Sequence, residues 1–199
     1  MSKTCILALT LSRNLPDIEG DWIGVDRGAL VLARAHRHMK LALGDFDSVK
    51  PEDMQIIRDY ADEVIQLNPI KDDSDSEAAV RYVAKQYDTI CMIGGLGGRI
   101  DHELVNLALC MEFAGKLILM DEHNRIEAFP EGTWHIARKA HYYSFFAEDA
   151  VISLEGFAYP LDHRHMTKKD LYGLSNEINN EEGILTVHTG TVLMIASKD

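Results

Sequence analysis

Three short segments of this sequence combine carboxylates, glycines and one arginine in patterns that suit phosphate chemistry. They are GDFDS (44–48), KDDSD (71–75) and GGLGGRIDH (94–102). Carboxylate oxygens are ligands that Mg²⁺ prefers, and the backbone N–H groups of glycine-rich turns can approach phosphate oxygens closely. Phosphoryl transfer from a nucleotide depends mainly on positioning and on neutralising charge, so this set of groups is suited to it.

The first segment places two aspartates one residue apart. In extended backbone, residues i and i+2 point to the same side, so Asp45 and Asp47 are expected to face one point while Phe46 turns into the core. Such a pair could hold Mg²⁺. Taken alone, the segment is more typical of an aspartate-rich turn than of a metal site.

The second segment stands at the start of a predicted helix. Ser74 and Glu77 fit a capping box, and Asp72, Asp73 and Asp75 supply three carboxylates around it. Acidic side chains near a helix N-terminus are favoured by the helix dipole. The acids of this segment therefore fit a structural role as well as a functional one.

The third segment has four glycines between an apolar run and a helical pattern. It is not a Walker loop, because no Lys-Ser/Thr pair follows, and Ile100 occupies the third glycine position of a dinucleotide fingerprint. Arg99 offers a planar set of donors suited to phosphate oxygens. One or two glycines would fit a tight turn, but four with an adjacent arginine favour phosphate binding.

The first 120 residues alternate short apolar runs with helical patterns. This alternation predicts a Rossmann-like α/β fold, a mostly parallel sheet with helices on both faces. In the last helix, Asp101 is the expected N-cap, and Leu104, Leu107, Ala108 and Met111 are spaced to form its apolar face. The apolar runs are 5–11, 22–25, 41–44, 63–67, 89–94 and 116–120, and the helical patterns are 28–37, 51–61, 74–87 and 101–114.

The chemistry-bearing segments all follow predicted strands. Asp26 ends the run 22–25 and adds one more acid at such a junction. Because parallel strands end at one edge of their sheet, we expect all these groups to form one rim there, where open α/β sheets bind ligands.

From about residue 123 the pattern becomes short β-type runs separated by turns. We therefore predict two domains, an α/β nucleotide-binding catalytic domain at 1–122 and a C-terminal all-β sandwich at 123–199. Within the second, HRH (163–165) is expected to be a solvated β-turn rather than a metal site.

Composition narrows the class of protein. The formal net charge of −12 argues against nucleic-acid binding, which relies on Lys and Arg. The apolar runs are too short for a membrane span or a typical signal peptide. Cys5, Cys91 and Cys110 each lie in an apolar run, which favours buried free thiols and a cytoplasmic location.

Over nearly its whole length the sequence resembles the thiamin pyrophosphokinase family. The three segments above carry the resemblance, together with GFAYPL (156–161) and GLSNE (173–177) in the second half. It implies an ATP-binding transferase, a kinase of thiamine diphosphate biosynthesis that moves the diphosphoryl group of ATP to the hydroxyl of thiamin and releases AMP. It also implies a magnesium cofactor and a homodimer whose active site is shared between the two subunits.

The resemblance assigns roles to the acids of the rim. By position, Asp45, Asp47 and Asp75 are the metal-binding and catalytic acids, and Asp72 lies nearby. Asp26 is counted with the nucleotide-binding residues.

It also assigns the glycine-rich loop and the helix after it. Gly97, Gly98 and Arg99 would contact ATP, Asp101 would lie near the reacting hydroxyl, and Asn106 would support the site.

In the β domain, Tyr159, Ser175 and Asn176 would contact thiamin, the tyrosine by stacking on an aromatic ring. The first strand departs from the pattern of many members, since it ends in LTLSR (9–13) instead of a glycine pair. Three alternatives remain: a diphosphokinase for another heterocyclic alcohol such as a pterin, a non-catalytic thiamin or nucleotide sensor, and a Mg²⁺-dependent nucleotide hydrolase.

Overall fold

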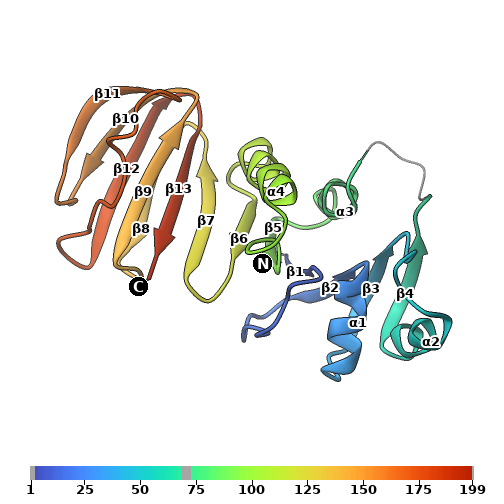
Figure 1. Ribbon diagram of the computed structural model, residues 1–199. Helices are drawn as coiled ribbons and strands as arrows, with labels where there is room; N and C mark the ends of the chain where they lie inside the picture. The colour runs from blue at the N-terminus through green and yellow to red at the C-terminus, as the bar shows by residue number, and fades with distance from the viewer. Residues whose placement is uncertain (1–2, 69–72, 199) are drawn as a thin grey trace. The chain divides into compact units, whose positions relative to one another are not determined.

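The computed structural model describes residues 3–68 and 73–198 (Figure 1). The chain divides into two compact units. One comprises residues 1–109 with 119–121, and the other comprises 110–118 with 122–199.

The first unit is built on five parallel strands that follow the predicted apolar runs. Their order across the sheet is β4-β3-β2-β1-β5. The chain steps outward from β1 to β4 and then returns to the other side of β1, so the strand order reverses between β1 and β5. The strands are β1 (Thr4–Ala8), β2 (Asp21–Val25), β3 (Met39–Gly44), β4 (Ala61–Gln66) and β5 (Thr89–Ile93).

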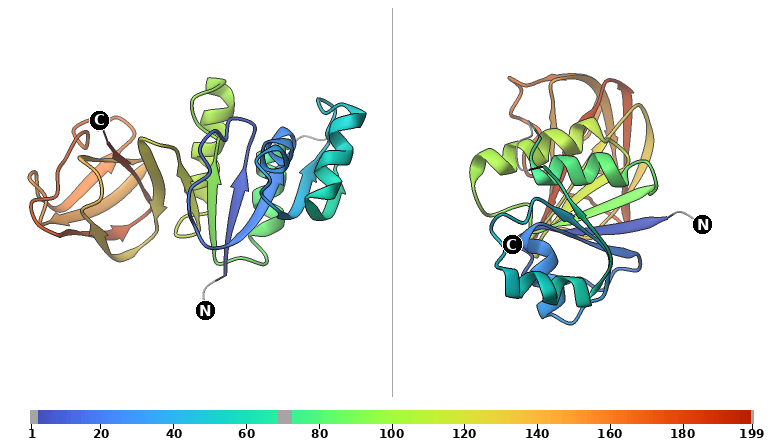
Figure 2. Two further views of the ribbon diagram at one scale, coloured as in Figure 1. Left: turned by 90° about the horizontal axis from the view of Figure 1, so that it is seen from below. Right: turned by 90° about the vertical axis from the view of Figure 1, so that its right-hand side faces the viewer.

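Helices cover both faces of this sheet. Two lie on one face and two on the other, as the views of Figures 1 and 2 agree. This is the arrangement that right-handed crossovers produce when the direction of winding changes. The helices are α1 (Arg27–Arg34) and α2 (Pro51–Asp59) on one face, and α3 (Asp75–Val83) and α4 (Ile100–Glu112) on the other.

Helix α4 differs from its prediction in two ways. It begins at Ile100, so Asp101 lies inside the first turn and is not the N-cap. The predicted apolar face is also wrong, because Leu104 is 62% exposed while Asn106 is buried with Leu109. The apolar spacing matched a helix but did not identify its buried side, and an asparagine points inward instead.

The second unit consists of antiparallel strands. Strands β7, β13 and β9 pair in that order, and β11, β10, β12 and β8 form a separate sheet. Strand β6 (Leu117–Met120) precedes them in the chain. The strands are β7 (Asn124–Phe129), β8 (Gly132–Ala137), β9 (Tyr142–Ala147), β10 (Asp149–Glu155), β11 (Leu161–Thr167), β12 (Glu182–Thr189) and β13 (Val192–Ser197).

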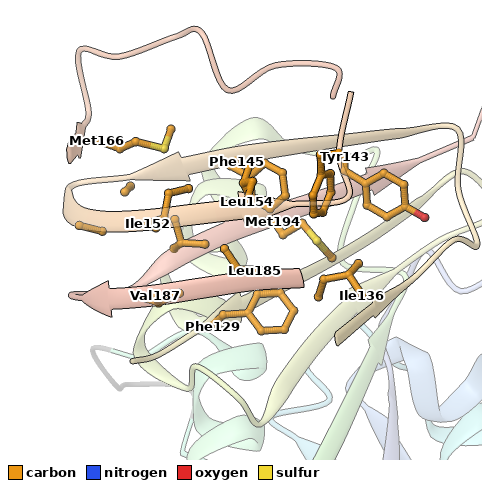
Figure 3. Close-up of a cluster of buried hydrophobic side chains, with 14 of the residues drawn as sticks. Phe129, Ile136, Tyr143, Phe145, Ile152, Leu154, Met166, Leu185, Val187 and Met194 are labelled. Atoms are coloured by element: carbon orange, nitrogen blue, oxygen red, sulfur yellow. The ribbon is translucent and has the colours of Figure 1, made fainter. Parts of the chain in front are cut away.

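Apolar side chains from all seven of these strands form the core of the second unit. Figure 3 shows them pointing into one layer, with Phe145 and Ile152 among the fully buried residues. The predicted fold class, a Rossmann-like α/β domain with a C-terminal β-sandwich, is therefore confirmed. The turn predicted at residues 163–165 is wrong, because these residues lie within β11.

Candidate active site

A cavity of about 350 Å³ opens at the carboxyl edge of the parallel sheet. The loops after β1 and β5 both line it, so it lies where the strand order reverses, the position at which open α/β sheets bind ligands. Its volume falls within the range of small-molecule sites. The lining residues are Leu9, Thr10, Leu11, Val25, Asp26, Ser74, Asp75, Ser76, Gly94, Gly95, Gly98, Arg99, His102, Glu103 and Asn106.

Asp45 and Asp47 follow β3 in a turn. Phe46 between them has φ +55° and is buried, so it reaches the core as predicted although the backbone there is not extended. The backbone N–H of Asp47 donates to Asp45 Oδ1 at 3.1 Å. Asp45 is half-buried and Asp47 is exposed. The segment is therefore a turn rather than extended backbone, and both aspartates follow the carboxyl end of β3 without being among the residues that line the cavity.

Asp26 follows β2 and is the N-cap residue of α1. Ser48 Oγ donates to its Oδ2 at 3.3 Å, whereas Oδ1 is buried and has no hydrogen-bond partner. Burial raises the pKa of the Asp26 carboxyl, and the nearby carboxylates of Asp75 and Asp45 raise it further. A hydrogen bond from the Arg27 backbone N–H lowers the pKa but does not cancel this rise. A partly buried carboxylate among other carboxylates indicates a site for a cation.

Asp75 opens α3 and lines the same cavity. The predicted cap is confirmed, since Ser74 Oγ accepts a hydrogen bond from the Glu77 N–H at 3.2 Å. The cap fixes the first turn of α3 and with it the direction of the Asp75 carboxylate. Asp72, also assigned to the site, lies outside the described residues.

The glycine-rich loop after β5 turns with Gly97 at φ +80°, a conformation that favours glycine. The backbone N–H groups of Gly97 and Gly98 converge on Glu103 Oε1, at 2.6 and 2.9 Å. Two convergent N–H groups form an anion-binding arrangement, and in this structure the anion is a side chain of the same chain.

Arg99 forms an exposed, bidentate ion pair with Asp101 through Nε and Nη2. The hydrogen bond from Arg99 lowers the pKa of the Asp101 carboxyl, and Asp101 in turn raises the pKa of Arg99. The two side chains therefore hold each other at the start of α4, next to the glycine-rich loop.

Asn106 is 2% exposed and points from α4 toward the loop. Its Nδ2 donates to the Gly95 carbonyl at 2.9 Å, and its Oδ1 is buried with no partner. Within residues 3–68 and 73–198, Asn106 Oδ1 and Asp26 Oδ1 are the two buried side-chain polar atoms without a hydrogen bond, and both residues line the cavity. A buried polar atom without a hydrogen-bond partner destabilises the fold unless a bound ligand supplies that partner.

Sequence reasoning missed several residues of this cavity. Glu103 resembled any surface glutamate, although its position three residues into α4 places it beside the loop. The loop after β1, where the family pattern is not kept, nonetheless lines the site through Leu9, Thr10 and Leu11. Behind it, Ser12 Oγ donates to the Ile93 carbonyl at 3.1 Å and joins the ends of β1 and β5.

The residues predicted to contact thiamin lie together in the second unit. Asn176 is buried, donates to the Tyr159 carbonyl at 2.9 Å and accepts from the N–H groups of Tyr159 and Glu177. Its amide is therefore used to hold the Tyr159 segment. The Tyr159 side chain is 68% exposed, and the Ser175 N–H donates to Ser144 Oγ at 3.0 Å.

The donor set at the sheet edge fits Mg²⁺. Among the described residues no three His, Cys, Asp or Glu side chains converge into a ready-made metal cage. Mg²⁺ commonly binds through one or two carboxylates together with substrate phosphates and water, so a cage is not required. The unpartnered Asp26 Oδ1 and the adjacent carboxylates provide oxygen ligands of this kind.

Comparison with known proteins identifies both halves of the chain. Residues 17–119 match the family described as "Thiamin pyrophosphokinase, catalytic domain", and residues 135–193 match "Thiamin pyrophosphokinase, vitamin B1 binding domain". The thiamine pyrophosphokinase of Bacillus subtilis (strain 168) is 34% identical over 200 residues, which covers 93% of this chain and 94% of that protein.

Solved structures agree over the full chain. A crystal structure of thiamine pyrophosphokinase from Bacillus subtilis superposes with a TM-score of 0.86 at 32% identity, covering 99% of this chain and 100% of that one. A thiamin pyrophosphokinase family protein from Enterococcus faecalis gives a TM-score of 0.87 at 28% identity, with 100% of both chains covered.

Proposed function

The chain belongs to the thiamin pyrophosphokinase family, and we propose that the cavity at its sheet edge holds ATP during formation of thiamin diphosphate. Its activity is the transfer of the diphosphoryl group of ATP to the hydroxyl of thiamin, with AMP as the other product. The observation that carries the site assignment is that Asp26 and Asn106, each with a buried unpartnered oxygen, line one cavity with the glycine-rich loop.

We infer an in-line displacement at the β-phosphorus of ATP. The thiamin hydroxyl oxygen forms a bond to that phosphorus, and the bond to the oxygen bridging the α-phosphate breaks. AMP leaves with the bridging oxygen, and the hydroxyl proton passes to water. Gly97, Gly98 and Arg99 bind the phosphate oxygens in this scheme, because they carry the loop's N–H and guanidinium donors.

Asp45, Asp47 and Asp75 would hold Mg²⁺ together with the phosphates, and Asp26 would contribute its unpartnered oxygen. The ion supplies neutralisation of the charge that develops on the transferred group. Asp101, two residues after Arg99 in the first turn of α4, orients the thiamin hydroxyl in this scheme.

Thiamin would bind the second unit beside Tyr159 and Ser175. The exposed Tyr159 ring offers a stacking surface for the cationic heterocycle. Asn176 acts there through its hydrogen bonds to the Tyr159 backbone, as a positioning residue.

We further propose that residues 1–122 are the nucleotide-binding catalytic domain and 123–199 the thiamin-binding domain, and that the enzyme is a homodimer with shared active sites. Exposed apolar side chains support association of two subunits: Ile100 and Leu104 on α4 are 73% and 62% exposed.

The structure describes no helix long and apolar enough to span a membrane. Cys5, Cys91 and Cys110 are buried, which supports the proposed cytoplasmic location.

An acceptor panel tests the proposed function. The protein with Mg²⁺ and ATP is incubated with thiamin, with a hydroxymethyl pterin or with no acceptor, and AMP is measured. We expect AMP to form in the mixture that contains thiamin and not in the other two. AMP formed only with the pterin would indicate a different diphosphokinase, nucleotide turnover without acceptor would indicate a hydrolase, and thiamin binding without AMP would indicate a sensor.

A further inference from the structure

The glycine-rich loop already holds a carboxylate where a phosphate oxygen is expected. Glu103 Oε1 accepts from the N–H groups of Gly97 and Gly98 at 2.6 and 2.9 Å. Both donors converge on one anionic oxygen, which is how such turns bind phosphate. Glu103 also lines the cavity that is assigned to the nucleotide.

The third donor of the loop is engaged in the same way. The guanidinium of Arg99 pairs with Asp101, which belongs to the same first turn of α4 as Glu103. The two glycine N–H groups and the Nε and Nη2 groups of Arg99 thus bind two carboxylates of one helical turn. An incoming triphosphate competes with these carboxylates, and at the two glycine N–H groups it has to replace Glu103.

We propose that Glu103 is a built-in competitor for the phosphate site, which occupies the Gly97 and Gly98 N–H groups until the phosphates of ATP displace it. The inference rests on the proposed function, because it requires ATP to bind at this loop. A ligand that binds only the open loop has an apparent affinity reduced by the open fraction. If Glu103 occupies the donors nine-tenths of the time, the affinity falls about tenfold.

The competition has a direct consequence for turnover. A triphosphate offers many oxygens and can displace the carboxylate while retaining other contacts. AMP carries a single phosphate, and we expect the returning Glu103 carboxylate to favour its release. Glu103 is thus a specificity-determining residue, and it touches the loop rather than the reacting atoms.

The opposite role would be a brace, in which Glu103 keeps the loop in its binding shape and its loss weakens ATP binding. Two variants separate these roles. Glu103→Asp keeps the negative charge in the cavity but retracts it by one methylene from the two N–H groups. Glu103→Gln keeps the length but weakens the hydrogen bonds, since a neutral acceptor binds N–H groups less strongly than a carboxylate. Glu52→Gln, on the exposed first turn of α2, is the charge control.

The experiment is calorimetric titration of MgATP, without thiamin, into wild type and the three variants. We expect Glu103→Asp and Glu103→Gln to bind about fivefold or more tightly than wild type, and Glu52→Gln to match wild type. The amide resonances of Gly97 and Gly98 should shift in both variants before ATP is added. Thermal unfolding verifies that each variant is folded.

Glu103→Asp is decisive because its charge is unchanged. Binding by Glu103→Asp that equals or is weaker than wild type overturns the proposal, whatever Glu103→Gln does, because a gain in the glutamine variant alone would reflect net charge. If wild type itself fails to bind MgATP, the proposed function falls and this inference falls with it. Wild-type binding without a gain in Glu103→Asp overturns only the inference.

Discussion

Gly44 and Asp26 approach so closely that no larger residue fits at position 44. A β carbon on residue 44 would lie 2.8 Å from the Asp26 α carbon and 2.9 Å from its nitrogen. Gly44 ends β3 and Asp26 follows β2, so this contact joins the ends of two neighbouring strands. It fixes the backbone that carries Asp26, which lines the cavity, and the start of the 45–47 turn.

Gly44→Ala should reduce both stability and activity. Because backbone atoms rather than a flexible side chain would be displaced, we expect a loss of about 1–3 kcal/mol in the free energy of unfolding. Activity of the folded fraction should fall as Asp26 moves. Gly20→Ala is the matched control, since its β carbon would lie 2.8 Å from the Thr4 carbonyl oxygen at the opposite edge of the sheet. Equal activity losses per folded molecule in the two variants would contradict this account.

Asp47→Ala should abolish most of the transfer activity without loss of stability. The side chain is exposed, and the hydrogen bond to Asp45 Oδ1 comes from its backbone, which the substitution keeps. We expect AMP formation with thiamin and ATP to fall at least about 100-fold, and excess Mg²⁺ to restore part of it. Asp17→Ala, at an exposed aspartate, serves as the control. A near-wild-type rate for Asp47→Ala would refute the metal assignment.

Tyr159 and Asn176 should respond differently to truncation. Tyr159→Ala removes an exposed ring, so we expect unchanged stability and a KM for thiamin raised up to about tenfold, with Tyr159→Phe close to wild type. Asn176→Ala removes three hydrogen bonds to the backbone of Tyr159 and Glu177, so it should also cost about 2 kcal/mol of unfolding free energy. Steady-state kinetics and urea unfolding measure both. An Asn176→Ala protein as stable as wild type would exclude the positioning role.

Tyr87→Phe should produce a pH-dependent loss of stability. The Tyr87 hydroxyl donates to Asp21 Oδ2 at 2.7 Å and is the main cause of the lowered pKa of Asp21, with Lys40 adding to it. A carboxyl whose pKa is lower in the folded than in the unfolded state stabilises the fold at pH values above its unfolded pKa, which is about 3.9 for aspartate. This stabilisation is lost as the pH falls through the folded-state pKa.

We therefore expect Tyr87→Phe to cost about 1 kcal/mol at pH 7, a value kept small because Asp21 is partly exposed. The difference from wild type should stay constant down to about pH 5 and narrow below about pH 4. Urea unfolding at pH 7 and pH 3 measures it, with Tyr82→Phe as control. A difference that grew on acidification would show that another group dominates.

The fold could be predicted largely from local pattern. Apolar runs alternating with helical periods identified all five parallel strands. Buried parallel strands are continuously apolar, as β1 and β5 are, and the edge strand β4, which has a mixed sequence, was identified by its shorter apolar run. The error at α4 has a physical origin: periodicity identifies a helix, but which side is buried depends on the neighbouring elements. There the loop after β5 needs the Asn106 amide, and Leu104 faces outward.

Of the site, only those residues could be predicted that stand together in one short segment of the sequence. The acids and glycines were visible because several unusual residues stand together. Glu103 was not, because its role arises from one turn of helix that brings its carboxylate back onto Gly97 and Gly98. The unpartnered oxygens of Asp26 and Asn106 are likewise a property of packing, and no sequence pattern encodes them.

The most direct test of the central claim is a product analysis of one reaction mixture. Purified protein is mixed with Mg²⁺, ATP and thiamin, and thiamin diphosphate, AMP and ADP are quantified over time. The account predicts thiamin diphosphate and AMP in equal amounts, no ADP, and no product when Mg²⁺ is chelated. Formation of ADP with thiamin monophosphate, or of AMP without thiamin diphosphate, would contradict it.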